Sequence, residues 1–202
     1  HPGGAGHLMM AYSFLRAMGL NGEIAAIKFD SQADTATASE GHKIERCDQG
    51  VISLTSQRYP FCADGPVDSD NSIRSGMSLV PFDQDLNRFM LFVTRLNSPK
   101  AKITWDQDSV VVSAEQLANG VHLTTLFPKN PFHAAFNAVD SAVAAKQAFE
   151  TQQIKKVFHG KEGKHDMESA VARTEKERAA LVSKIAAARS AVAHQLSIQP
   201  VE

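Results

Sequence analysis

The residues best suited to chemistry open the sequence, where a histidine-proline pair leads into a glycine-rich run. The stretch reads HPGGAGHLMMAYSFLRAMG and carries imidazoles at His1 and His7. Histidine is the usual general base near neutral pH, because its unperturbed pKa is about 6.5. Apolar residues then recur at helical spacing from Leu8 to Met18, and Gly19 stands where a left-handed C-cap ends a helix. We therefore predict a loop that presents a histidine and a helix that holds it in place.

The run HPGGAGHLMMA at 1–11 resembles the last block of the SGNH (GDSL-like) hydrolases, commonly D-x-x-H-P-x-x-x-G-H/Y-x-x-M/I-A. The resemblance implies that His1 is the base that activates a catalytic serine. His7 falls at the helix start and takes no catalytic role. The Asp that orients the family's histidine would stand three positions before His1, outside these residues.

The rest of the family's catalytic set has no counterpart in the sequence. It contains no Gly-Asp-Ser motif and no block that supplies the oxyanion-hole Gly and Asn. The resemblance therefore implies the C-terminal part of an SGNH-type esterase. Its nucleophilic serine would lie on a missing N-terminal segment or on another chain, so this polypeptide alone would not be competent.

A second stretch, from Leu91 to Leu126, is similar to the accessory β-region of one bacterial branch of these hydrolases. The matching pieces are LFVTRL, KITWD and VSAEQLANGVHLT, with His122 in place of the pattern's Asn. The resemblance then covers about 1–155. It implies hydrolysis of carboxylic esters without a metal or organic cofactor, with acetylated carbohydrate as one substrate class of the wider family. It also favours an exported bacterial protein, periplasmic or secreted.

Composition limits the other functional classes. The net charge is -1 over 202 residues, which gives no indication of nucleic acid or an anionic membrane as a partner. No apolar run approaches the roughly 20 residues of a membrane-spanning helix. The two cysteines, Cys47 and Cys62, could close a loop of about 15 residues worth roughly 3 kcal/mol, or could stay as free thiols.

The pattern of apolar residues predicts an α+β fragment in three parts. The resemblance implies that 1–22 is the end of a flavodoxin-like α/β hydrolase domain, and the apolar pattern predicts a small antiparallel β accessory region at 23–129 and a helical hairpin at 130–202. Within the β region, strands are expected at 23–29, 43–55, 88–96, 101–105 and 109–112, and an extended piece at 121–127. Short helices are expected at 33–40 and, from the capping box of Ser113 and Gln116, at 113–120.

The hairpin is expected to begin at the N-cap pair Asn130-Pro131 and to turn at the GKEG sequence of 160–163. Its second helix is expected over 164–196. The apolar stripe of that helix consists of Leu181, Ile185, Ala188, Val192 and Leu196. Two roles remain open: packing against the missing hydrolase domain, or forming a homo-oligomer.

The segment 56–76 is a long loop by composition, dense in Pro, Gly, Asp and Ser. It could cover an active-site cleft, or it could be an insertion packed through Tyr59 and Phe61. Its polar cluster, Asp64, Asp68, Asp70 and Asn71, lacks the spacing of an EF-hand calcium loop, so solvated acids are the better interpretation.

Two alternatives come from other functional classes. A free amino terminus at His1 could chelate copper together with His7, although enzymes with such a site are β-sandwiches and much of this sequence predicts helix. The chain could also be a non-catalytic module that binds glycan or protein through the 56–76 loop and an exposed Trp105 hairpin. The remaining histidines are expected to be solvated or packing residues: His122, His133, His159, His165 and His194.

Overall fold

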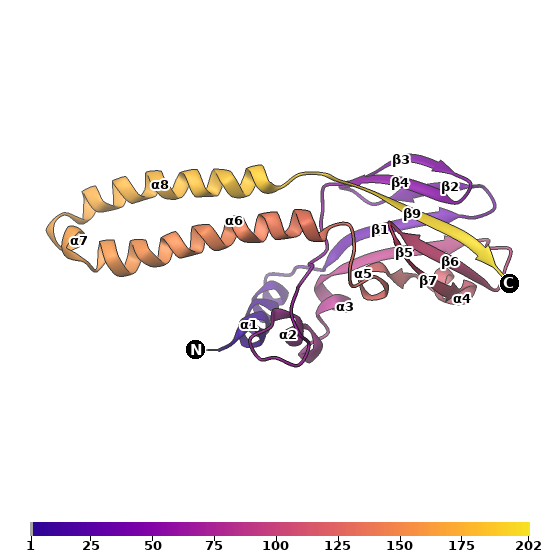
Figure 1. Ribbon diagram of the computed structural model, residues 1–202, viewed down its shortest axis with the longest axis horizontal. Helices are drawn as coiled ribbons and strands as arrows, with labels where there is room; N and C mark the ends of the chain where they lie inside the picture. The colour runs from indigo at the N-terminus through magenta and orange to yellow at the C-terminus, as the bar shows by residue number, and fades with distance from the viewer. Residues whose placement is uncertain (1) are drawn as a thin grey trace. The chain divides into compact units, whose positions relative to one another are not determined.

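A computed structural model describes residues 2–202 (Figure 1), so the predicted base His1 lies outside the described residues. The chain divides into two compact units, one that ends at residue 133 and includes 191–202, and one formed by 134–190. The first contains both β-sheets and the second is helical, which gives the α+β class that the sequence predicts.

The smaller sheet is built around β1. Its order is β2-β1-β5-β8, with β1 and β5 parallel and the other two pairings antiparallel. The strands are β1 (Glu23–Asp30), β2 (Thr35–Ala38), β5 (Arg88–Thr94) and β8 (Val121–His122). Alternate residues of β1 and β5 are buried, as expected for strands with one face on a core.

The larger sheet has the C-terminal strand at its centre. Its order is β3-β4-β9-β6-β7, and β9 pairs antiparallel with both β4 and β6 (Figure 1). The strands are β3 (His42–Asp48), β4 (Val51–Ser56), β6 (Lys100–Trp105), β7 (Asp108–Ser113) and β9 (Val192–Val201). His194, Leu196 and Ile198 of β9 are buried in alternation.

Aromatic rings join the two sheets. The Phe89 ring of β5 lies 5.4 Å from Trp105 of β6 and 5.3 Å from Phe132, measured between ring centroids. All three side chains are almost fully buried. This buried aromatic core fixes how the sheets face each other and how the loops at their edges are placed.

Three helices form a satellite cluster in the first unit. They are α1 (Gly4–Ala17), α2 (Ile73–Leu79) and α3 (Phe82–Leu86). Leu8, Phe82 and Leu86 are its buried centre. Gly76 permits the close approach of α1 and α2, because a Cβ there would lie 2.9 Å from the backbone of Ala5. Two further short helices are α4 (Ala114–Asn119) and α5 (Leu123–Leu126).

The second unit is a helical hairpin. Its elements are α6 (His133–Gln152), the π-helix η1 (Gln153–Phe158), α7 (Lys161–His165) and α8 (Met167–Ala188). Gln153 donates a 2.9 Å hydrogen bond to Thr174 across the seam, and both side chains are buried. Arg178 pairs with Glu150 at 2.7 Å. Polar contacts therefore stabilise much of the packing of α6 and η1 against α8.

Local sequence signals predicted several features correctly. Gly19 has φ of 78°, and its N–H and that of Leu20 cap the end of α1. The capping box of Ser113 and Gln116 begins α4. The hairpin of β6 and β7 turns at Asp106, between the strands expected at 101–105 and 109–112.

Other predictions are wrong. The second long helix ends at Ala188 rather than Leu196, because residues 192–201 complete the larger sheet. The expected helix at 33–40 is the strand β2, which pairs with β1. The expected strand at 43–55 is two strands, separated by the turn at Gln49 and Gly50, and the extended piece at 121–127 contains α5.

Candidate functional site

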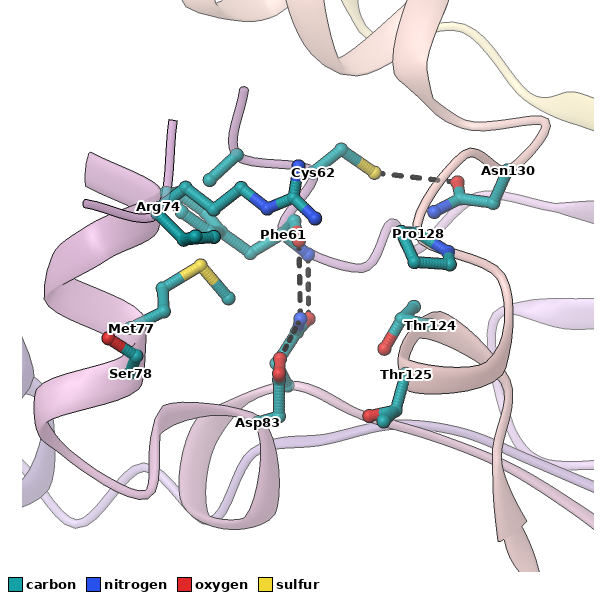
Figure 2. Close-up of a pocket in the computed structure, with 13 residues that line it drawn as sticks. Phe61, Cys62, Arg74, Met77, Ser78, Asp83, Thr124, Thr125, Pro128 and Asn130 are labelled. Atoms are coloured by element: carbon teal, nitrogen blue, oxygen red, sulfur yellow. Dashed lines mark hydrogen bonds between the residues drawn. The ribbon is translucent and has the colours of Figure 1, made fainter. Parts of the chain in front are cut away.

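The candidate site is a pocket of about 250 Å³ on the first unit, between the loop after β4 and the helices α2, α3 and α5. Figure 2 shows Arg74 and Met77 of α2 on one side and Thr124 and Pro128 on the other. No sequence pattern indicates this pocket, because its residues come from separate segments without a common spacing.

Asn87 fixes the loop that forms one wall. Its side chain accepts a 2.6 Å hydrogen bond from the N–H of Phe61 and donates a 3.2 Å bond to the carbonyl of Phe61. It also donates a 2.9 Å bond to Asp83 Oδ1. The Phe61 ring packs 5.3 Å from Phe82 of α3. The prediction that the loop packs through Phe61 is therefore confirmed, and Tyr59 likewise packs 5.8 Å from Phe132.

His122 organises the opposite wall. Its Nε2 lies 3.0 Å from the carbonyl oxygen of Asp83, which can only accept, so Nε2 donates there; in this tautomer Nδ1 accepts from the Thr124 hydroxyl at 2.9 Å. Because the Thr124 hydroxyl hydrogen is used in this bond, the Thr124 oxygen can only accept hydrogen bonds from a ligand. Within residues 2–202, the hydroxyl of the neighbouring Thr125 has no hydrogen bond.

Asn130 and Arg74 supply donors at the rim. Asn130 Oδ1 accepts from the Phe132 N–H at 3.1 Å and from the Cys62 thiol at 3.5 Å, which leaves the Nδ2 amide hydrogens for another partner. The exposed Arg74 guanidinium has no ion pair or hydrogen bond among the residues that the structure describes. The pocket thus combines an unpaired cation with the carboxylate of Asp83.

Cys62 lines the pocket but is poorly suited to nucleophilic chemistry. Burial raises the pKa of its thiol to about 12, so the thiol stays protonated at neutral pH. Both cysteines are free, and the disulfide that the sequence left open does not form. The Cys47 thiol instead donates to the carbonyl of Asp34 at 3.4 Å.

A second set of polar side chains lies in the core rather than at a surface. Ser56 Oγ is 2.8 Å from both His42 Nδ1 and His194 Nε2. Trp105 Nε1 donates to His194 Nδ1 at 3.1 Å, and His42 Nε2 donates to the carbonyl of Ile24 at 2.8 Å. Ser56 is fully buried, so this Ser–His pair has no access to substrate and serves the fold.

The residues of the alternative hypotheses form no second site. His7, which the copper hypothesis used, is exposed on α1, and His159 and His165 are exposed, as the sequence predicts. Among the described residues, no group of three His, Cys, Asp or Glu side chains could hold a metal ion. The Trp105 hairpin is not an exposed binding surface, because Trp105 is only 2% exposed and lies in the aromatic core.

Comparisons with known proteins show the fold alone. No family model and no curated protein matches the chain. A solved structure described as a gut microbial diltiazem-metabolizing enzyme is similar over 100% of this chain, with a TM-score of 0.68 and 20% identity. The chain spans 55% of that enzyme's length. No helix of the described part of the chain is long and apolar enough to cross a membrane.

Proposed function

We propose that this chain is the C-terminal part of an SGNH-type serine hydrolase that acts on carboxylic esters. In this proposal His1 is the general base for a serine that lies outside residues 1–202. The resemblance of the HPGGAGH run supplies the assignment, and the surface of α1 supplies the physical support.

The observation that carries the proposal is that α1 has apolar residues on two faces. Its inner face packs Leu8 and Tyr12 against the satellite cluster. Its outer face leaves Met10 52% and Phe14 66% exposed, and the C-cap residue Met18 is 74% exposed. A helix that is apolar on both faces is normally buried within a larger protein. We infer that the outer face packs against the α/β domain that carries the serine.

The comparison with the solved structure is compatible with this proposal. That protein is described as an enzyme that metabolizes diltiazem, which is an ester-bearing drug. Since the present chain covers 55% of it, the enzyme includes further polypeptide beyond the shared part.

The proposed reaction is ordinary acyl transfer. His1 takes the proton of the serine hydroxyl as the serine oxygen attacks the ester carbonyl, and the imidazolium returns that proton to the leaving alcohol. Water, deprotonated by the same imidazole, then attacks the acyl-enzyme. The serine leaves with the proton, and the free acid is released.

The test is ester hydrolysis by the intact protein and its His1→Gln variant, with p-nitrophenyl acetate as the substrate. We expect the variant to lose at least about a thousandfold in kcat, because the nucleophile loses its base. His7→Gln is the matched control, since His7 is exposed on α1, and it should retain activity. Equal activity of both variants would refute the role of His1.

The second candidate is a non-catalytic binding module. The pocket beside the 56–76 loop favours it, because that loop contributes Phe61 and Val67 to a concave site that also contains Arg74 and Asp83. An intact protein that hydrolyses no ester but binds a ligand in this pocket would favour the module over the hydrolase.

A further inference from the structure

We propose that the pocket beside Arg74 binds a hydroxylated carboxylate about the size of one sugar-acid residue. The inference concerns binding in this chain alone, so it does not depend on the proposed esterase. The evidence is the set of donors and acceptors in the pocket that have no hydrogen-bond partner within the protein.

The unused donors lie at the rim. The Arg74 guanidinium has no partner within the described residues, and Asn130 has its Oδ1 fully engaged but its Nδ2 hydrogens available. A guanidinium binds a carboxylate through two parallel hydrogen bonds, which is stronger and more specific than a single contact. These donors therefore fit the carboxylate end of a ligand.

The unused acceptors suit hydroxyl groups. Asp83 Oδ1 accepts from Asn87, and Oδ2 has no hydrogen-bond partner among residues 2–202. Thr124 donates its hydrogen to His122, and Ser78 donates its hydrogen to the carbonyl of Ser75 at 2.7 Å, so both oxygens can only accept. A ligand without hydroxyl donors would leave these oxygens unsatisfied once they are desolvated.

The size and the walls limit the ligand further. A volume of about 250 Å³ is near the lower end of small-molecule pockets, which suits a single ring. Phe61 and Met77 give the site an apolar side on which the C–H face of a sugar ring can pack. Asp83 disfavours a doubly charged phosphate more than a singly charged carboxylate, because the repulsion between like charges grows with the charge of the ligand.

The experiment is calorimetric titration of the intact protein with glucuronate, glucose, propionate and inorganic phosphate. We expect glucuronate to bind at least about tenfold more tightly than the other three probes, since it alone satisfies both sets of groups. Glucose binding as tightly as glucuronate, tighter phosphate binding, or no binding of any probe would overturn the proposal.

Two variants place the ligand in this pocket. Arg74→Gln should weaken glucuronate binding by at least about tenfold while leaving glucose unchanged, and Thr125→Val should weaken both. Arg46→Gln is the matched control, because Arg46 is an exposed arginine on β3 that pairs with Asp48 outside the pocket. Unchanged circular dichroism shows that each variant folds. An Arg74→Gln variant that binds like the wild type would contradict the proposal, whatever the result of the esterase test.

Discussion

Ser56 Oγ lies 2.8 Å from His194 Nε2 in the core between the two sheets, and the direction of this hydrogen bond is fixed by its neighbours. Because Trp105 donates to His194 Nδ1, the single hydrogen of the neutral ring must be on Nε2 and point at Ser56. The Ser56 hydroxyl then donates to His42, which donates to the carbonyl of Ile24. A proton added to either ring would face another donor, so both histidines are neutral in the folded protein.

The stability of the fold should therefore fall as the pH falls below neutrality. Burial lowers the pKa of His194 to about 4 and also lowers that of His42. The unfolded histidines titrate near 6.5, so the unfolded state binds more protons between about pH 6.5 and 4. For His194 alone, the free energy of unfolding should drop by roughly 2 kcal/mol between pH 7 and pH 5. Urea denaturation at a series of pH values measures this.

The pH prediction has an internal control. Exposed carboxylates with lowered pKa, such as Asp30, lose their contribution only at more acidic pH, so the window from pH 7 to 5 isolates the histidines. In a His194→Gln variant the slope in this window should be smaller. Identical slopes in the variant and the wild type would show that His194 is not held neutral.

Ser56→Ala should destabilise the protein by about 2–4 kcal/mol. The change leaves the His194 Nε2 hydrogen and the His42 Nδ1 lone pair buried without partners, and each such loss costs about 1–3 kcal/mol. Ser53→Ala, on the same strand, is the matched control and should change the free energy of unfolding by less than about 0.5 kcal/mol. Chemical denaturation that gives equal effects for the two variants would argue against the buried network.

Because β9 is the central strand of the larger sheet, truncating one of its buried side chains should cost more stability than it would if these residues formed a helix. Leu196→Ala should cost about 2–5 kcal/mol, because Leu196 is fully buried between β4 and β6. Val182→Ala, at a half-exposed site on α8, should cost less than about 1 kcal/mol. If urea denaturation showed that Leu196→Ala lowers the free energy of unfolding by no more than Val182→Ala does, β9 would not be the middle strand of the sheet.

The error over β9 shows where sequence patterns reach their limit. Ile185, Val192 and Leu196 continue the helical stripe, while His194, Leu196 and Ile198 alternate as in a strand. Both periods fit the same residues. The choice depends on β4 and β6, which each need a partner and are far away in the sequence. By contrast, Gly19 and the Ser113 capping box were predictable because their hydrogen bonds are local.

The pocket was hidden from sequence analysis for a similar reason. Arg74, Asp83 and Asn130 come from three segments, and only the tertiary fold brings them together. Asn87 is a clear case, since its role depends on both backbone groups of Phe61, 26 residues away. Nothing in the residue types near Asn87 points to that contact.

The outer face of α1 gives the next prediction. Phe14→Ser should leave the stability of residues 1–202 nearly unchanged, because Phe14 is largely exposed there. In the intact protein the same change should weaken packing against the proposed α/β domain and lower the melting temperature by several degrees. Differential scanning calorimetry of both forms measures the contrast. Equal shifts in the two forms would show that nothing packs on this face.

In the proposed hydrolase, this chain supplies the base for a serine outside it. The most direct measurement is to treat the intact protein, with any chain that co-purifies, with a fluorophosphonate probe and to locate the adduct by intact mass and peptide mapping. We expect a single adduct on a serine outside residues 1–202, with labelling that slows sharply in His1→Gln. An adduct on a serine within residues 2–202, or no adduct on any chain, would contradict it.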